Sequence, residues 1–257
     1  MGIAKWIQRF VAVGILAAGV GGGWLMSDDR LAWEIHLELD TNTEDSFGAA
    51  KERLFNEVDR EPDNTILCRY SATVVDLVED DGRLGPDPDA GVQVEHTWAS
   101  QASWAPQGDR FPRDSVPGAD LHHLFAVRQG INASRGNHPF GELPETAREL
   151  SVKVNGSLAA AGEGTPSGSF RDENSGGVTV FEPRDDHKGD VARAMFYMSV
   201  RYWMAIPDDM EDDLRTWHVA DPAGDDETTR NDKIEGIQGN RNPFVDFSDL
   251  AERISDF

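Results

Sequence analysis

The sequence predicts a mixed α+β fold, with one domain at residues 29–257 preceded by an apolar N-terminal segment. Residues 65–78 are rich in β-branched side chains, which is typical of one or two strands. In residues 190–203, apolar side chains recur at steps of three and four, which indicates a helix packed against the core. The chain has no internal repeat and no change of composition that would mark a second domain.

The first 28 residues are expected to form an export signal or a membrane anchor. Lys5 and Arg9 precede a largely apolar run at 10–26, after which the chain becomes polar. A basic flank followed by an apolar run is typical of a signal peptide, but a run of about 17 residues also reaches the short limit of a membrane span. Two interpretations stay open: a cleaved signal of a secreted or periplasmic protein, or an anchor formed by residues 10–26.

The first half of the domain is expected to combine one helix with short strands. Residues 45–58 place alanine, leucine and phenylalanine at helical spacing. Acidic residues and glycine predict a turn at 79–82, and the sequence Gly-Pro-Asp-Pro-Asp-Ala-Gly predicts a loop at 85–91. Residues 92–94 alternate like a short strand that leads into a Glu-His pair.

The second half is expected to alternate irregular segments with regular elements. Residues 99–118 lack periodicity and predict an irregular loop, whereas residues 121–127 are apolar around two histidines and predict a second strand. A helix is expected at 130–137. Residues 161–177, rich in Gly, Ser and Thr, are the best candidate for a mobile excursion, and the strand expected at 178–181 is stopped by a proline.

Cys68 is the only cysteine, so no intrachain disulfide can form. Its apolar neighbours predict a small buried side chain rather than a nucleophile. The stability of the domain is therefore expected to come from its core and from any bound ion.

Charge is the outlying feature of the composition. The 47 acidic residues outnumber the 24 basic ones, of which only 5 are lysine, and the net charge is −23. An acidic surface poor in lysine suggests a halophilic protein, because salt screens its self-repulsion. Such a charge would repel nucleic acid, but residues 91–140 balance four acidic residues with four arginines and hold four of the seven histidines. The local neutrality keeps a nucleic-acid substrate open.

Three stretches concentrate residues that suit phosphodiester hydrolysis, at 94–98, 120–124 and 132–137. That reaction needs a base to deprotonate water, a cation to neutralise developing charge, and donors that hold the phosphate. Histidine is a base near neutral pH, carboxylate and amide oxygens are ligands for Mg²⁺, and arginine binds phosphate.

Glu95 and His96 are neighbours in sequence, and neighbours on a regular strand point to opposite faces. They could serve one site only where the strand ends or bends, and an Asn on a helix packed across the strands could then complete an ion site. His122 and His123 lie in an apolar run, where a structural hydrogen-bonded pair is the default interpretation.

Five ordered groups of residues together resemble the bacterial endonuclease I family. The groups are VEHTW at 94–98, DLHHLF at 120–125, INASRGNHPFG at 131–141, FEP at 181–183 with KGDVARAMFY at 188–197, and RND at 230–232 with QGNRNPFVD at 238–246. The resemblance implies a ββα-metal nuclease core. It also implies a secreted or periplasmic enzyme, a monomer without a protein partner, that cuts DNA and in some cases RNA non-specifically and leaves 5′-phosphate ends.

The same resemblance assigns roles to residues. It implies that Glu95 and Asn132 bind one Mg²⁺ ion, which Mn²⁺ could replace, and that His96 is the general base. Arg135 is implied as a second catalytic residue that holds substrate or site structure. The resemblance places four further residues that match the family motifs in a supporting shell around the site: Asp120, His122, His123 and Asn137.

Two positions depart from the family pattern. Ala99 and Ala126 stand where the family commonly has proline, which predicts a looser loop near the site but leaves the three central residues intact. Two other function classes stay open: a catalytically silent exported binding protein stabilised by metal, and a phosphodiesterase of small substrates.

Overall fold

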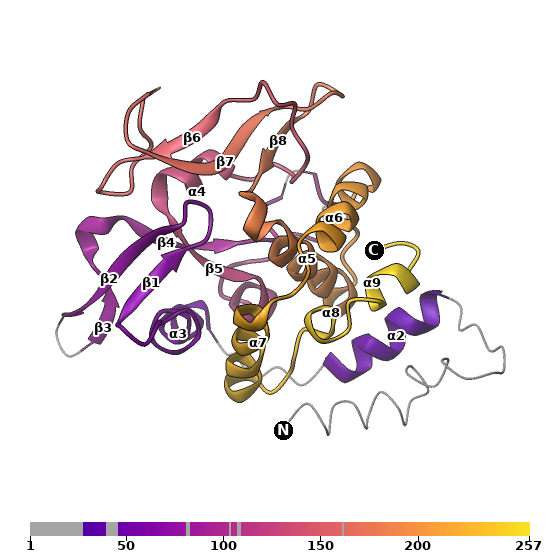
Figure 1. The fold of residues 1–257 in the computed structure, drawn as a ribbon. Coiled ribbons are helices and arrows are strands. Elements are labelled where there is room, and N and C mark those ends of the chain that lie inside the picture. The colour runs from indigo at the N-terminus through magenta and orange to yellow at the C-terminus, as the bar shows by residue number, and fades with distance from the viewer. Residues whose placement is uncertain (1–27, 40–45, 81–82, 103, 107–108, 161) are drawn as a thin grey trace.

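The structure is a computed structural model that describes residues 28–39, 46–80, 83–102, 104–106, 109–160 and 162–257. The expected signal or anchor at 1–28 lies outside this part of the chain, apart from its last residue. Within the described ranges, no helix combines the length and the apolar character that crossing a membrane requires. The described residues form helices and small antiparallel sheets, which confirms the mixed α+β prediction (Figure 1).

Two strands and a helix, β4, β5 and α4, lie near the middle of the molecule (Figure 1). We call them the strand–strand–helix unit. β4 (Val92–His96) pairs antiparallel with β5 (Leu124–Arg128), with Glu95 opposite Phe125. α4 (Gln129–Arg135) begins at the residue after β5 and contacts both strands. The strand expected before the Glu-His pair is confirmed, and it continues through that pair.

A second sheet packs against this unit. β1 (Thr65–Cys68), β2 (Thr73–Asp80) and β3 (Arg83–Pro86) form an antiparallel meander, so the β-branched run contains two strands. The Arg69 N–H donates to the Ala126 carbonyl at 2.8 Å and thereby ties the end of β1 to β5. The loop was expected to begin at Gly85, but Gly85 and Pro86 are the last two residues of β3 and pair with β2. The prediction therefore placed the start of the loop too early. Proline is tolerated there because it closes an edge strand.

The helix expected at 45–58 is confirmed. α3 (Phe47–Arg53) continues into one π-helical turn, η2 (Leu54–Val58). The Ala49 N–H donates to Ser46 Oγ at 3.2 Å, which caps the first turn of the helix. The buried side chains of these two elements pack with β5 in the smaller of two apolar clusters.

The segment before β5 departs from the single strand expected at 121–127. Leu121–His123 form a 3-10 turn, η6, and β5 begins only after it. The Asp120 carboxylate accepts a hydrogen bond from the His122 N–H at 3.1 Å, which holds the backbone in the turn. The expectation was wrong because a short apolar run does not distinguish a buried turn from a buried strand.

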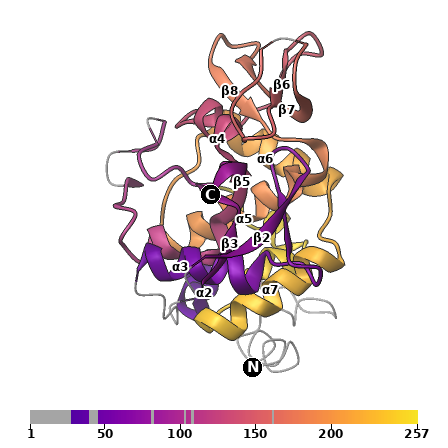
Figure 2. The same ribbon diagram turned by 90° about the vertical axis from the view of Figure 1, so that its left-hand side faces the viewer.

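A third sheet lies over α4. β6 (Glu149–Val152), β7 (Thr165–Glu173) and β8 (Thr179–Glu182) are antiparallel neighbours, and β8 confirms the strand expected before Pro183. Figures 1 and 2 both place this sheet at one end of the molecule, with α4 directly beneath it. The sheet therefore borders the strand–strand–helix unit on the side of α4.

The mobile excursion expected at 161–177 is wrong, because most of that stretch is β7. Its two serine side chains are buried, and each donates a hydrogen bond to a backbone carbonyl. Ser167 Oγ donates to the Leu150 carbonyl at 2.6 Å, and Ser169 Oγ donates to the Tyr70 carbonyl at 2.9 Å. The hydroxyl groups thus bind this strand to the rest of the domain.

α5 (Lys188–Tyr202) is the core helix expected at 190–203, and it is buried along most of its length. It packs against α2 and α6, and its apolar side chains belong to the larger apolar cluster. Cys68 is buried as expected, and burial raises the pKa of its thiol to about 11. The other described helices are α2 (Asp28–Leu39), α6 (Asp208–Ala220), α7 (Asp225–Gln238), α8 (Pro243–Asp246) and α9 (Leu250–Arg253).

Candidate active site

A cleft of about 220 Å³ lies between the end of β4 and one side of α4. We call it the Glu95 cleft. The side chains of Glu95 and His96 both line this cleft. β4 ends at His96, which agrees with the expectation that the pair can share one site only at a strand end. Its lining residues are Gln93, Val94, Glu95, His96, Ala99, Ser100, Arg113, Asn132, Ala133, Arg135, Gly136 and Asn137.

The Glu95 carboxylate is held in a nearly dry environment, with the residue only 3% exposed. Arg135 Nε lies 3.2 Å from Glu95 Oε1, a contact of opposite charges without hydrogen-bond alignment. The Tyr70 hydroxyl donates to the same oxygen at 3.3 Å. Burial raises the pKa of Glu95 to about 7, because the favourable charge of Arg135 and the Tyr70 hydrogen bond compensate only part of the lost hydration.

His96 is oriented by a backbone carbonyl. Its Nε2 donates to the Gly118 carbonyl at 2.9 Å, which assigns the proton to Nε2 and leaves the lone pair on Nδ1. The rings of Phe47 and His123 lie 5.0 and 5.3 Å from the imidazole, between centroids. Burial lowers the pKa of His96 to about 3, with a further contribution from His123, so the ring is neutral around pH 7. A neutral imidazole is the form that can accept a proton.

Asn132 stands on α4 across the cleft from the end of β4. Its Nδ2 donates to Gln93 Oε1 at 3.1 Å, and this orientation assigns Oδ1 to the other side of the amide. An amide oxygen and a buried carboxylate that lacks full compensation suit a hard cation such as Mg²⁺, which keeps several waters and needs few protein ligands. Among the described residues, no three His, Cys, Asp or Glu side chains gather into a fuller cation cage. The two donors, one carboxylate and one amide, fit a cation whose remaining ligands are waters.

Arg135 is 1% exposed and binds the elements around the cleft together. Its Nη2 donates to the Thr97 carbonyl at 2.7 Å and its Nη1 to the Gly136 carbonyl at 3.0 Å, so the guanidinium connects the end of β4 to the end of α4. The guanidinium also lies over the Phe140 ring, 4.7 Å from its centroid. Asn137 lines the cleft from just beyond α4, which ends two residues earlier than expected.

Asp120 is fully buried and does not line the Glu95 cleft. Its carboxylate accepts hydrogen bonds from side chains in the C-terminal half of the chain. Its Oδ2 accepts from the hydroxyls of Tyr197 and Tyr202 at 2.8 and 2.7 Å, and its Oδ1 accepts from Gln238 Nε2 at 2.8 Å. Burial raises the pKa of Asp120, but the interactions with His122 and Arg201 and the Gln238 hydrogen bond outweigh it and bring the pKa to about 2.

The paired histidines of η6 face different neighbours. His122 Nε2 pairs with the Asn240 carbonyl at 3.3 Å, while His123 Nε2 pairs with the Pro117 carbonyl at 2.7 Å. Burial lowers the pKa of both imidazoles to about 4. Neither residue lines the cleft, but the ring of His123 contacts that of His96. Of these two histidines, His123 is therefore the one in contact with a residue of the cleft.

Three residues of the site were not singled out from the sequence. Tyr70 follows β1 and reaches Glu95, Gln93 orients Asn132, and Arg113 lines the cleft from the irregular segment before η6. The positive charge of Arg113 lowers the pKa of both Glu95 and His96. Only Arg113 had a signal in the sequence, as one of the arginines that balance the acidic residues of 91–140.

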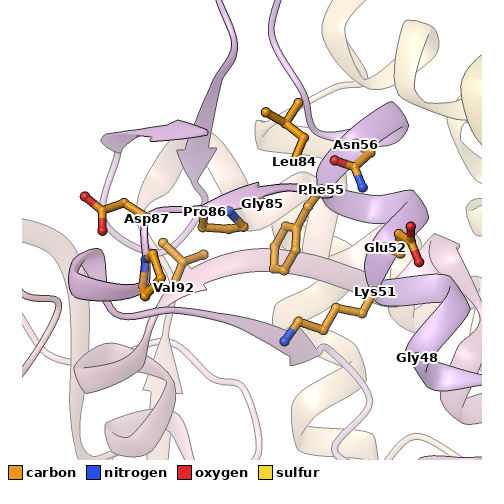
Figure 3. A pocket seen from close by; sticks show the side chains of 11 residues that line it. Gly48, Lys51, Glu52, Phe55, Asn56, Leu84, Gly85, Pro86, Asp87 and Val92 are labelled. Atoms are coloured by element: carbon orange, nitrogen blue, oxygen red, sulfur yellow. The ribbon is translucent and has the colours of Figure 1, made fainter. Parts of the chain in front are cut away.

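A larger cavity of about 400 Å³ lies between α3 and β3, with Val92 of β4 in its lining. Figure 3 shows Lys51 and Phe55 pointing into it from the helical side, with Pro86 and Val92 opposite. It contains no histidine, and its two carboxylates belong to Glu52 and Asp87. Because it has no imidazole to act as a base, the smaller Glu95 cleft is the better candidate for hydrolysis despite its size.

Curated relatives of this chain are nucleases. It is 34% identical over 175 residues to an extracellular ribonuclease of Bacillus subtilis (strain 168), covering 61% of this chain and 54% of the relative. It is 27% identical over 127 residues to a periplasmic deoxyribonuclease of Aeromonas hydrophila, covering 49% and 47%. It is also 29% identical over 126 residues to Endonuclease-1 of Buchnera aphidicola subsp. Baizongia pistaciae, covering 49% and 45%. The chain spans about half the length of these relatives.

The family comparison covers most of the chain. Residues 30–249 match the family described as Endonuclease I, a range that contains β4, β5, α4 and every residue of the Glu95 cleft. The match also includes the core helix α5 and most of the C-terminal helices. The chain therefore belongs to the endonuclease I family.

Proposed function

We propose that this protein is a secreted or periplasmic, magnesium-dependent endonuclease that hydrolyses phosphodiester bonds without sequence preference and acts as a monomer. The observation that carries the proposal is the meeting of three groups in one cleft. They are the buried carboxylate of Glu95, the neutral imidazole of His96 and the amide of Asn132. Together they provide a base and two oxygen ligands for a hard cation.

In this mechanism, His96 removes the proton from the attacking water. Its Nδ1 accepts that proton as the water oxygen bonds to phosphorus, while the Gly118 carbonyl holds the ring through Nε2. Glu95 and Asn132 would hold the Mg²⁺ ion, which supplies charge neutralisation for the phosphorane and the leaving oxygen. Breaking the bond between phosphorus and the 3′ oxygen leaves a 5′-phosphate end, and the 3′ oxygen takes a proton from solvent to become a 3′ hydroxyl.

The low pKa of His96 has a consequence for this mechanism. An imidazole with a pKa of about 3 is a weak base, whereas the most effective base has a pKa near the working pH. A phosphodiester in the cleft brings a negative charge close to the ring, and a nearby negative charge raises the pKa of a histidine. The negative charge of the bound phosphodiester thus acts against the low pKa that burial imposes on His96.

The substrate range is proposed to include DNA and RNA. The relatives described above are named as a ribonuclease and as a deoxyribonuclease, which supports both polymers. Arg113 lines the cleft and can bind phosphate, which DNA and RNA share.

The decisive test is to incubate the purified chain with plasmid DNA and with RNA, in Mg²⁺, in Mn²⁺ and in EDTA. We expect cleavage with either metal and none with EDTA, because without a cation nothing neutralises the negative charge that develops on the phosphate during the reaction. Cleavage of bis-(p-nitrophenyl) phosphate without cleavage of either polymer would identify a small-substrate phosphodiesterase instead. No cleavage of any substrate in metal would leave the silent binding protein as the explanation.

Salt is expected to affect this enzyme unlike a basic nuclease. The net charge of −23 supports a halophilic protein, whose self-repulsion and repulsion of nucleic acid decrease as salt increases. We expect the cleavage rate to persist or rise as NaCl increases to molar concentrations. The rate on plasmid DNA across a NaCl series measures this, and steep inhibition from low salt upward would contradict it.

A further inference from the structure

A third cavity, of about 460 Å³, adjoins the Glu95 cleft on the side of the β6–β8 sheet. We call it the Arg171 cleft. It shares Gln93 and Ala133 with the Glu95 cleft, so the two adjoin each other at α4, and Figure 1 shows α4 between β4 and β7. Its polar lining includes Gln93, Gln129, Ser134 and Arg171.

Arg171 presents a cation to this cleft from β7. Its Nη1 donates to the Ser134 carbonyl at 3.1 Å, near the C-terminal end of α4. That bond uses one of the five N–H donors of the guanidinium and holds the group against the helix. The side chain is exposed, and its positive charge contributes to lowering the pKa of the nearby His138. An exposed, oriented guanidinium is well suited to bind a phosphate.

The cleft offers neutral donors as well. Gln129 and Gln93 carry side-chain amides, and Ser134 has a hydroxyl that is buried without a hydrogen-bond partner among the described residues. An unpartnered buried hydroxyl is uncommon in a folded protein and favours a ligand or water at this point.

The charge of the two clefts differs from that of the whole chain. Their linings hold Arg113, Arg135 and Arg171 against a single carboxylate, Glu95, although the chain carries 47 acidic and 24 basic residues. A polyanion would be repelled by most of this surface but not here. The electrostatics thus favour one continuous track for a nucleic-acid strand.

Residues of the Arg171 cleft lie close to the site residues along β4 and α4. Gln93 precedes Glu95 by two residues on β4, a separation of about 7 Å in a strand. Gln129 and Asn132 are three residues apart on α4, a rise of about 4.5 Å. A nucleic-acid strand whose scissile phosphate lies at Glu95 would therefore pass Gln93 and Ala133, which line both clefts, as its next nucleotide enters the Arg171 cleft.

We propose that the Arg171 cleft is a second substrate subsite, which binds the phosphate next to the scissile one through Arg171, with Gln93 and Gln129 as neutral donors. This proposal rests on the proposed nuclease function and adds to it the cause of a preference for polymers over small diesters. A single-phosphate substrate occupies only the Glu95 cleft. Polynucleotide occupies both.

The test compares Arg171→Ala with Arg253→Ala, a variant with the same charge change on α9, which Figure 1 shows far from α4. Binding of a fluorescein-labelled oligonucleotide in EDTA and steady-state cleavage in Mg²⁺ are both measured. For Arg171→Ala we expect Kd and KM for polynucleotide to rise about tenfold, with kcat unchanged, because one charge-assisted phosphate contact is lost. The slope of log affinity against log salt should change by about 0.7–0.9 relative to wild type, and Arg171→Lys should restore it.

The small substrate distinguishes the possible outcomes. Wild-type and Arg171→Ala protein should hydrolyse bis-(p-nitrophenyl) phosphate equally, or both fail to, since that diester does not reach the second cleft. If Arg171 serves only to cap α4, the variant would lower the Tm without changing Kd, which would overturn the proposal, as would a Kd equal to that of Arg253→Ala. A wild-type chain that binds oligonucleotide in EDTA but never cleaves it would refute the nuclease function alone.

Discussion

The His96→Ala variant is expected to lose about 10²- to 10⁴-fold in kcat on plasmid DNA, the usual contribution of a general base. The reason lies in the single orientation of the ring: Nε2 is engaged by the Gly118 carbonyl, so Nδ1 is the nitrogen that can take the proton of water. The binding of oligonucleotide in EDTA should change little, because the phosphate contacts are made by other side chains. Initial rates of nicking in Mg²⁺ measure the effect.

His218→Ala provides the matched control. Its Nε2 is paired with the Ser248 carbonyl at 2.9 Å, the same distance as in His96, but it lies on α6 outside the Glu95 cleft. We expect this variant to lose stability and to keep its kcat. Since alanine at position 96 also leaves a gap among aromatic rings, His96→Gln, whose amide can donate to Gly118, separates lost packing from lost base. A wild-type rate in His96→Ala or His96→Gln would refute the assigned role.

The Asp120→Asn variant is expected to lower the free energy of unfolding by about 3–5 kcal/mol, as for other broken buried charge pairs. The carboxylate accepts hydrogen bonds from Tyr197, Tyr202 and Gln238, and Arg201 lies 3.3 Å from its Oδ2. An amide would turn its NH₂ group toward one set of these donors and leave the arginine charge without its buried partner. The midpoint of urea denaturation measures the loss.

Asp256→Asn is the control, because it removes one negative charge from an exposed position near the C-terminus. We expect its urea midpoint to stay near that of wild type. If Asp120→Asn unfolded at the same urea concentration as this control, the buried carboxylate would not be the structural hub that its contacts indicate. Loss of cleavage without loss of stability would instead assign Asp120 a direct part in the reaction.

Local patterns in the sequence were sufficient to predict several elements. The steps of three and four in the apolar residues of α5 and the β-branched run of β1 and β2 identify elements whose local preference agrees with their burial. Helices α6 and α7 were not predicted, because they are rich in acidic residues and carry few apolar ones. Which of their sides is buried is decided by the elements packed against them. Local preference is a weak guide where tertiary packing decides.

Part of the site also followed from the sequence, through its resemblance to the endonuclease I family. Glu95, His96 and Asn132 were selected as ligand, base and ligand, and the structure places all three in one cleft. The structural condition for this, a strand that ends at the Glu-His pair, follows from the alternation of side chains in a strand. What they do there stays a proposal until the variants are measured.

The sequence by itself determined the chemical types at the cleft, the core helix and the acidic character of the chain. Only the tertiary structure decided that Tyr70 reaches Glu95, that Gly118 selects the tautomer of His96, and that Arg171 extends the cleft from β7. Each of these contacts joins residues at least 22 positions apart, for which no short pattern carries a signal. The Glu95 cleft is thus a product of long-range packing, because burial and orientation, which set the pKa values and free donors of its residues, exist only once the separate segments meet.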